Sequence, residues 1–249
     1  NLRSMTLSAT YFDLDYKGRV VQPINPPSQA LSGNPMFEPF VVRNPTAAQQ
    51  ADVFSKADFF DNYSSGPYDP SQVVAIVYDT YQNATSQKLN GMDMAYRQTF
   101  QLPKSSLNAF LNATWLHLDQ STVATLPNVR LSGTILNAPD LKVRGGMSWQ
   151  KGGFSSTAVV NYISDEIDDG VIPSVPIASW TTVDATVAYR FGGQSGFSQN
   201  LKVVVSASNL FDKQPPRAVS PAILYPGMYF DSANSSIIGR FVSLTVTKG

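Results

Sequence analysis

The sequence predicts an all-β fold, a transmembrane antiparallel up-and-down β-barrel of which about eight strands are present. Three observations predict it: alternating apolar and polar side chains, connections that alternate between short and long, and a shortage of charged residues. A period of two is typical of strands with one apolar and one polar face. Barrels of outer membranes have short turns at one end and long loops at the other.

The alternation is clearest at residues 141–150. Leu141, Val143, Gly145, Met147 and Trp149 alternate there with Lys142, Arg144, Gly146, Ser148 and Gln150. The run at 183–191 repeats the pattern, with Val183 and Val187 on one face and Asp184 and Arg190 on the other. We predict eight strands, at residues 2–16, 83–100, 106–118, 139–150, 153–166, 177–191, 200–211 and 236–248.

The connections between these strands fall into two groups. Residues 103–105, 151–153 and 192–200 make short turns, whereas 17–82, 119–138, 167–176 and 212–235 are long. All short turns are therefore expected at one end of the sheet. Within the first long connection, Thr46 is placed as the N-cap of a short helix. Residues 73–81 are expected to extend the second strand.

Aromatic residues on the apolar faces fit the height of a membrane. Phe154 and Tyr162 are eight residues apart, about 26 Å along a strand and about 20 Å along the membrane normal at the usual tilt. One aromatic rim would hold Trp149, Phe154 and Tyr189, and the other Tyr11, Trp115 and Tyr162. The alternative is the core of a soluble sandwich, which would show the same alternation but no sorting of loops by length.

Composition excludes several classes of protein. The 249 residues include 18 Lys plus Arg and 18 Asp plus Glu, and this balance argues against a nucleic-acid partner. Charged residues are 14% of the chain, below the usual 25% or so, which indicates that part of the surface avoids water. No cysteine is present, so disulfides and thiolate metal sites are excluded. No apolar run is long enough for a membrane-spanning helix.

The segment "NLFDKQPPR", residues 209–217, follows the alternating run "LKVVVSAS". Pro215 and Pro216 have no N–H to give to a neighbouring strand, so the strand must end or leave its sheet. Asn209 and Asp212 can turn the chain by bonding nearby backbone. The segment is therefore predicted to be an abrupt exit from a strand.

With these elements placed, the chain resembles the C-terminal part of a TonB-dependent outer-membrane receptor. The resemblance spans essentially all of residues 1–249, as one barrel portion without further domains, and depends on the order of several segments. These are "SATYFDLDYKGRV", "YQNATSQKLNGMDMAY" with Asn83, Gly91 and Asp93, "GGMSWQKGGFSSTAVVNYIS", "SWTTVDATVAYRF" with Asp184, "NLFDKQPPR" and "GRFVSLTVTKG".

The resemblance implies a role in nutrient uptake. Members of the family have a 22-stranded barrel filled by a plug, and a TonB complex pulls on an N-terminal segment that is not part of this sequence. The implied function is uptake of an iron chelate, cobalamin or a glycan across a Gram-negative outer membrane, with lipid, lipopolysaccharide and a small ligand as partners. No enzymatic activity and no cofactor are expected. The start lacks a signal peptide, and the last strand stops at Gly249, one position before the terminal aromatic residue that is usual in such barrels, so we expect trimming at both ends.

Two sets of residues are candidates for contact with a ligand or a lumen. By parity, Asp93, Arg144 and Asp184 face the lumen. The same holds for Arg97, Lys142, Gln150 and Arg190. In the outer loops, the aromatic and polar groups suited to gripping a small polar ligand are Tyr63, Tyr68, Arg217, Tyr225 and Tyr229. Each of these also has a simpler interpretation, as a solvated polar wall or as loop packing.

Other chemical sites are weakly indicated. The carboxylates at 165, 166, 168 and 169 suit a hard cation such as calcium, but Ile167 and Pro176 break the EF-hand pattern. His117, the only histidine, has Asp119 nearby and no nucleophile that the sequence identifies, so an outer-membrane hydrolase is a minor alternative. A further alternative is a closed eight-stranded barrel with a structural or adhesive role, in which 2–16 pairs with 236–248.

Overall fold

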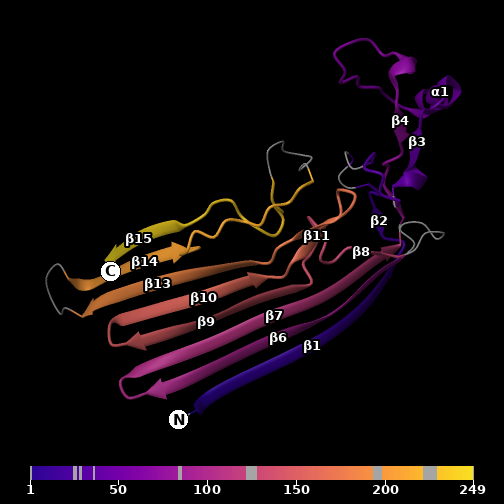
Figure 1. Ribbon diagram of the computed structural model, residues 1–249. Coiled ribbons are helices and arrows are strands. Elements are labelled where there is room, and N and C mark those ends of the chain that lie inside the picture. Colours follow the sequence, from indigo (N-terminus) through magenta and orange to yellow (C-terminus); the bar gives the residue numbers. More distant parts are fainter. Residues whose placement is uncertain are drawn as a thin grey trace.

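One curved antiparallel sheet dominates the computed structural model (Figure 1). The structure describes residues 2–24, 27, 30–35, 37–83, 86–121, 128–192, 198–220 and 229–248. In spatial order the main strands are β1 (Leu2–Lys17), β6 (Ser86–Leu102), β7 (Ser105–Ser121), β9 (Leu141–Lys151), β10 (Phe154–Ile163), β13 (Trp180–Gly192), β14 (Gln199–Ser208) and β15 (Phe241–Lys248). Each predicted strand corresponds to one of these eight, and every neighbouring pair is antiparallel.

The sheet is open, and its described strands do not close into a barrel within this chain. Strands β1 and β15 form its two opposite edges, and no described residue of one pairs with the other. The ladder of this chain therefore ends in unpaired backbone groups at both edges. A closed eight-stranded barrel needs pairing between these two strands, so that alternative is not supported.

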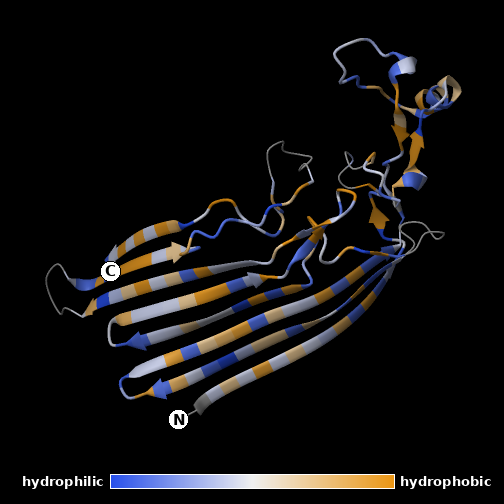
Figure 2. Cartoon of the chain, in the orientation of Figure 1, coloured by the Kyte–Doolittle hydropathy of each residue, from blue (hydrophilic) through white to orange (hydrophobic). Residues whose placement is uncertain are grey.

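The two faces of the sheet differ in polarity, as the alternation along each strand in Figure 2 shows. On the apolar face, Met147 is 52% exposed, Val187 46% and Leu244 68%. In a sandwich these side chains would be buried against a second sheet. Within the described residues no second layer covers them, so the soluble sandwich is not supported. Their exposure suits contact with lipid.

The apolar face ends sharply near the long connections. Tyr11 lies across from Met92, and Met92 lies across from Trp115, so these three residues form a row on one face. The next outward row holds Asp13, Asn90 and His117. At the other limit Trp149 and Phe154 have ring centroids 5.6 Å apart, and Phe154 pairs with Tyr189. The structure thus places five of the six predicted aromatic residues at the limits of the apolar band, while Tyr162 lies across from Val143, one row inside that of Trp115.

Short turns and long connections lie at opposite ends of the sheet (Figure 1). Leu102 pairs with Ser105 around a two-residue turn in which Lys104 has a φ of 63°. Lys151 pairs with Phe154 around Gly152 and Gly153. Both chain ends lie at this same end. The long connections are called here the outer loops, and comprise the described residues within 18–85, 128–140, 164–179 and 209–240.

The outer loops contain their own short elements. The two-stranded sheets are β2 (Val20–Val21) with β5 (Gln82–Asn83), β3 (Val41–Arg43) with β4 (Ala75–Val77), and β11 (Glu166–Asp168) with β12 (Val175–Ile177), while β8 (Val129–Arg130) pairs with β7. The expectation that 73–81 extends the second strand is therefore wrong. Residues 75–77 pair with β3 instead, because the chain folds back on itself beyond the main sheet.

The first outer loop forms a lobe around a small apolar core. Ile24, Ala30, Phe37, Phe40 and Val41 are buried together, and two 3₁₀ turns (Glu38–Phe40 and Pro70–Gln72) flank the helix. Helix α1 (Ala47–Lys56) begins at the predicted N-cap, Thr46. The Thr46 hydroxyl accepts from the Gln49 backbone N–H, and the Gln49 side chain accepts from the Thr46 N–H at 2.8 Å. No helix among the residues described above is long and apolar enough to cross a membrane.

Candidate functional site

A hydrogen-bond network crosses the polar face of β9, β10 and β13. Asp184 accepts from the Asn161 side-chain amide at 2.9 Å and from the backbone N–H of Asn209 at 2.9 Å. Arg144 donates to the Asn161 side-chain oxygen, and its Nη1 lies 4.0 Å from Asp184 Oδ2. The network therefore holds the end of β14 against the neighbouring strands.

The "NLFDKQPPR" exit is built on the same network. Asn209 has a φ of 47°, and its side-chain amide bonds the backbone of Lys213 twice, at 2.9 and 3.0 Å. Asp212 accepts from the Arg240 backbone N–H at 2.8 Å, across the loop at the approach to β15. The predicted turn is confirmed at Asn209, and the Asp212 backbone N–H donates to the Asn209 carbonyl at 2.8 Å, while the Asp212 side chain bonds the distant Arg240. These residues shape the exit and need no ligand to explain them.

The structure places all three candidate lumen residues on the polar face. Asp93 accepts from the Thr114 hydroxyl at 2.6 Å, and the two residues lie directly across from each other. By strand register, the same face carries Arg97, Lys142, Gln150 and Arg190. That this face borders a lumen stays a prediction.

Buried carboxylates fix the outer loops to one another. The fully buried Asp168, in β11, accepts from the backbone N–H groups of Val219 at 2.8 Å and Ser220 at 2.7 Å. It also accepts from the Ser220 hydroxyl and from the Gly170 N–H at 3.2 Å. A carboxylate that accepts several donors is well satisfied without a counter-ion. Asp168 therefore anchors the segment after the prolines.

A second buried carboxylate, Asp231, joins a different pair of loops. It accepts from the Leu136 N–H at 2.9 Å and from the Ala233 N–H at 2.7 Å. The Asn234 side chain donates to both Asp231 and Glu166, at 2.9 and 3.0 Å. Burial, and then the nearby Asp231 carboxylate, raise the pKa of Glu166 to about 8. Glu166 is therefore protonated at neutral pH in the folded loops.

The suggested cation site at residues 165–169 is not supported. The carboxylates point to different partners, Asp168 to Ser220 and Glu166 to Asn234. In the part of the chain that the structure describes, no group of three or more His, Asp or Glu side chains is arranged to hold a metal ion. Backbone and side-chain donors satisfy Asp168 and Glu166 instead.

The predicted ligand-contact residues separate into two places. Tyr63 is 94% exposed in the lobe, whereas Tyr68 packs against Phe54 at 4.9 Å between ring centroids and bonds the Gln50 side chain. Elsewhere, the Arg217 guanidinium lies 5.6 Å from the ring centroid of Tyr229. Tyr225 falls outside the described residues. Only Arg217 and Tyr229 are therefore brought together, and their role in binding stays a prediction.

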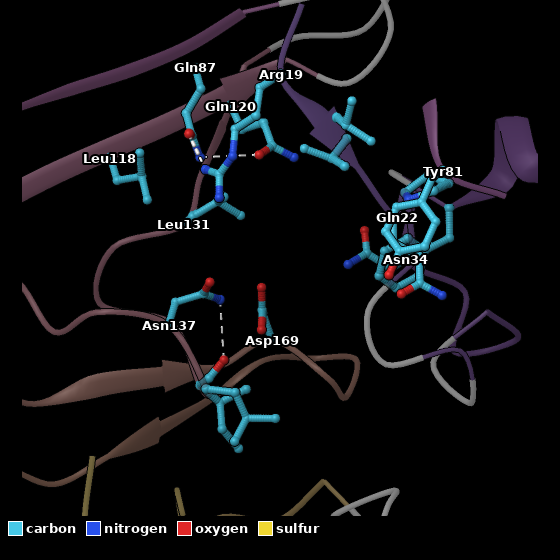
Figure 3. A pocket seen from close by; sticks show the side chains of 16 residues that line it. Arg19, Gln22, Asn34, Tyr81, Gln87, Leu118, Gln120, Leu131, Asn137 and Asp169 are labelled. Carbon is cyan, nitrogen blue, oxygen red and sulfur yellow. Dashed lines mark hydrogen bonds between the residues drawn. The ribbon is translucent and has the colours of Figure 1, made fainter. Parts of the chain in front are cut away.

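The outer loops enclose a cavity of about 450 Å³ that the sequence did not reveal (Figure 3). Its polar lining includes Arg19 and Gln87 on one side and Asn137 and Asp169 on another. Arg19 donates to the Gln87 side-chain oxygen, and Gln87 donates to Gln120 at 3.3 Å. The volume lies within the range typical of small-molecule sites.

Sequence reasoning missed this cavity because its residues come from segments far apart in the chain. Arg19 precedes β2, Gln87 and Gln120 lie on β6 and β7, and Asp169 follows β11. The available signals were the Gly18-Arg19 pair after the first strand and the acid beside Gly170. Neither one identifies a site without knowledge of how the loops pack.

His117 has an acidic neighbour and no nucleophile. Its Nε2 lies 3.2 Å from Asp119 Oδ2, on the outward face of β7. Among the described residues, no hydroxyl side chain hydrogen-bonds to His117. The described residues offer His117 no hydroxyl group to activate, so they give the hydrolase alternative no support.

The fold and the site together define a class. An antiparallel sheet with an exposed apolar face, a polar face and long loops at one end is the wall of an outer-membrane β-barrel. The family model described as TonB dependent receptor-like, beta-barrel matches residues 1–210. The chain therefore belongs to this family of outer-membrane transport proteins. Neither the comparison with curated proteins nor that with solved structures found a match.

Proposed function

We propose that this chain is the C-terminal portion of a 22-stranded receptor barrel that takes up a scarce nutrient with energy from a TonB complex. The nutrient would be an iron chelate, cobalamin or a glycan, and the membrane the outer membrane of a Gram-negative cell. Membership of the receptor family carries this proposal. The open edges of β1 and β15 support it, because further strands must pair with them for the barrel to close.

The outer loops support binding before transport. The cavity of about 450 Å³ is lined by several of the outer loops, among them the first, which contributes Arg19 and Phe37. Tyr63, Arg217, Tyr225 and Tyr229 would make further contacts from the loops, and Asp93, Arg144 and Asp184 would line the path inside the barrel. In this proposal the barrel and its plug move the ligand without making or breaking a bond in it.

Uptake in a deletion strain tests the proposal. Cells that lack the native full-length protein should lose growth on one limiting nutrient and recover it with a plasmid copy. The matched control is the same plasmid in cells without a functional TonB complex, where recovery should fail. Unchanged growth of the deletion strain on iron chelates, cobalamin and glycans would contradict transport.

A further inference from the structure

The cavity in the outer loops carries two opposite charges on separate walls. Of its described lining residues, Arg19 is the only cation and Asp169 the only carboxylate. Figure 3 shows Arg19 beside Gln87 and Gln120, and Asp169 beside Asn137 across the cavity. The two come from different loops, because Arg19 precedes β2 and Asp169 follows β11.

Among the described residues, no side chain of opposite charge pairs with Arg19 or Asp169. Arg19 donates instead to the neutral amide oxygen of Gln87. The nearby acid Asp79 is occupied elsewhere, since it accepts from Gln22 at 2.7 Å and from the Ile24 N–H at 3.0 Å. Burial raises the pKa of Asp169, which is the effect expected for a carboxylate without a cationic partner.

The charge pattern selects one kind of ligand. A purely anionic ligand would satisfy Arg19 and be repelled by Asp169, and a purely cationic one would do the reverse. A ligand with an ammonium and a carboxylate at its two ends would neutralise both charges. The amide nitrogens of Asn137 and Gln22 donate within the protein, and their side-chain oxygens can accept from the polar middle of the ligand. Leu118 and Leu131 form an apolar part of the cavity wall, against which small apolar side chains of the ligand would pack.

We infer that this cavity binds a small zwitterion, an amino acid or short peptide, with its carboxylate at Arg19 and its ammonium at Asp169. The inference rests on the proposed function in taking the outer loops as the place of ligand capture, and it puts a zwitterion in place of the iron chelate, cobalamin or glycan named there. It concerns binding only and involves no chemical step.

Calorimetric titration of the native full-length protein in detergent tests the inference, with trialanine as the probe. Two analogues each lack one charge: N-acetyl-trialanine has no ammonium, and trialanine amide has no carboxylate. Trialanine should bind about tenfold more tightly than either analogue, because each end contributes a charge-assisted hydrogen bond. Equal affinity for all three, or no binding of trialanine, would overturn the inference.

Two variants test which cavity residue binds each end of the ligand. Asp169→Asn should weaken trialanine binding about tenfold and leave N-acetyl-trialanine unchanged, since that analogue has no ammonium to lose. Arg19→Gln should weaken trialanine in the same way and leave trialanine amide unchanged. The matched controls Asp165→Asn and Lys17→Gln remove exposed charges that do not line the cavity. A loss that is equal for all three peptides would mean that the variants only disturb the loops, and would count against the assignment.

The two proposals can fail separately. If trialanine does not bind but another nutrient is taken up in a TonB-dependent manner, the zwitterion inference fails and the transport function stands. If trialanine binds and no nutrient enters the cell, the cavity is a binding site and the transport function fails.

Discussion

The sheet and the outer loops are stabilised in different ways. Strands of the sheet are joined by long, regular ladders, such as the pairing of β6 with β7 from Ser86 to Leu102. The outer loops have only short ladders, and a few buried side chains such as Asp168 and Asp231 hold them in place. Stability is thus spread over many equivalent bonds in the sheet and concentrated in a few residues in the loops.

Asp168→Ala should give the largest effect, and it tests most directly whether a few buried residues hold the outer loops in place. It removes the acceptor of the Val219, Ser220 and Gly170 N–H groups, so we expect a loss of about 4 kcal/mol in loop stability. Limited proteolysis should then cut residues 209–220 while the sheet keeps its heat resistance. The exposed Asp165→Ala is the control, and equal protection in both variants would refute the role of Asp168.

Leu244→Lys tests whether the apolar face of the sheet meets lipid. Its side chain is 68% exposed on the apolar face, where lipid is expected, so a lysine should cost about 3 kcal/mol. Thr245→Lys, one residue along β15, places the same charge on the polar face and should cost little. Urea unfolding in lipid bilayers measures both. Similar values would mean that the two faces do not meet different solvents.

A pH series sharpens the comparison within the loops. Between about pH 4.5 and about pH 8, Glu166 holds a proton in the folded loops and loses it when they unfold. Loop stability should therefore fall as pH rises through this range, by at most about 1.4 kcal/mol for each pH unit. Hydrogen exchange of residues 229–240 measures it. In Glu166→Gln the slope should disappear, and a persisting slope would point to another group.

Thr46→Ala should have the smallest effect. The substitution removes the N-cap of α1 and should destabilise that helix by about 1 kcal/mol without affecting the sheet. Faster hydrogen exchange confined to residues 47–56 would show it. Ser55→Ala, which lies on the same helix and caps nothing, provides the comparison and should leave exchange unchanged.

The sequence predicted the sheet much better than the loops. A period of two over eight or more residues located every main strand, and "NPTAAQQ" located the start of α1. Strands such as β3 and β11 have three residues each, too few for a period to be visible. Tyr68 is predicted from sequence to contact a ligand, and the structure shows that it also packs against Phe54, which sequence alone could not reveal.

The cavity could not be predicted for a related reason. Arg19 and Asp169 line the same cavity only once the two long connections that carry them have folded over the end of the sheet. Local pattern carries no information about that packing. The sequence placed Asp184 on the polar face but did not reveal its hydrogen-bond partners. One of them, Asn209, directly follows another strand, β14.

The lobe joins the sheet in a way that would allow another segment to replace it. Lys17 and Ser86 lie directly opposite each other at the ends of β1 and β6, so residues 18–85 leave and return at a single rung. Exchanging or shortening this whole segment would not shift the register of any other rung. Such an attachment lets the external tip diversify under selection by phages, antibodies or new nutrients while the scaffold beneath it stays constant.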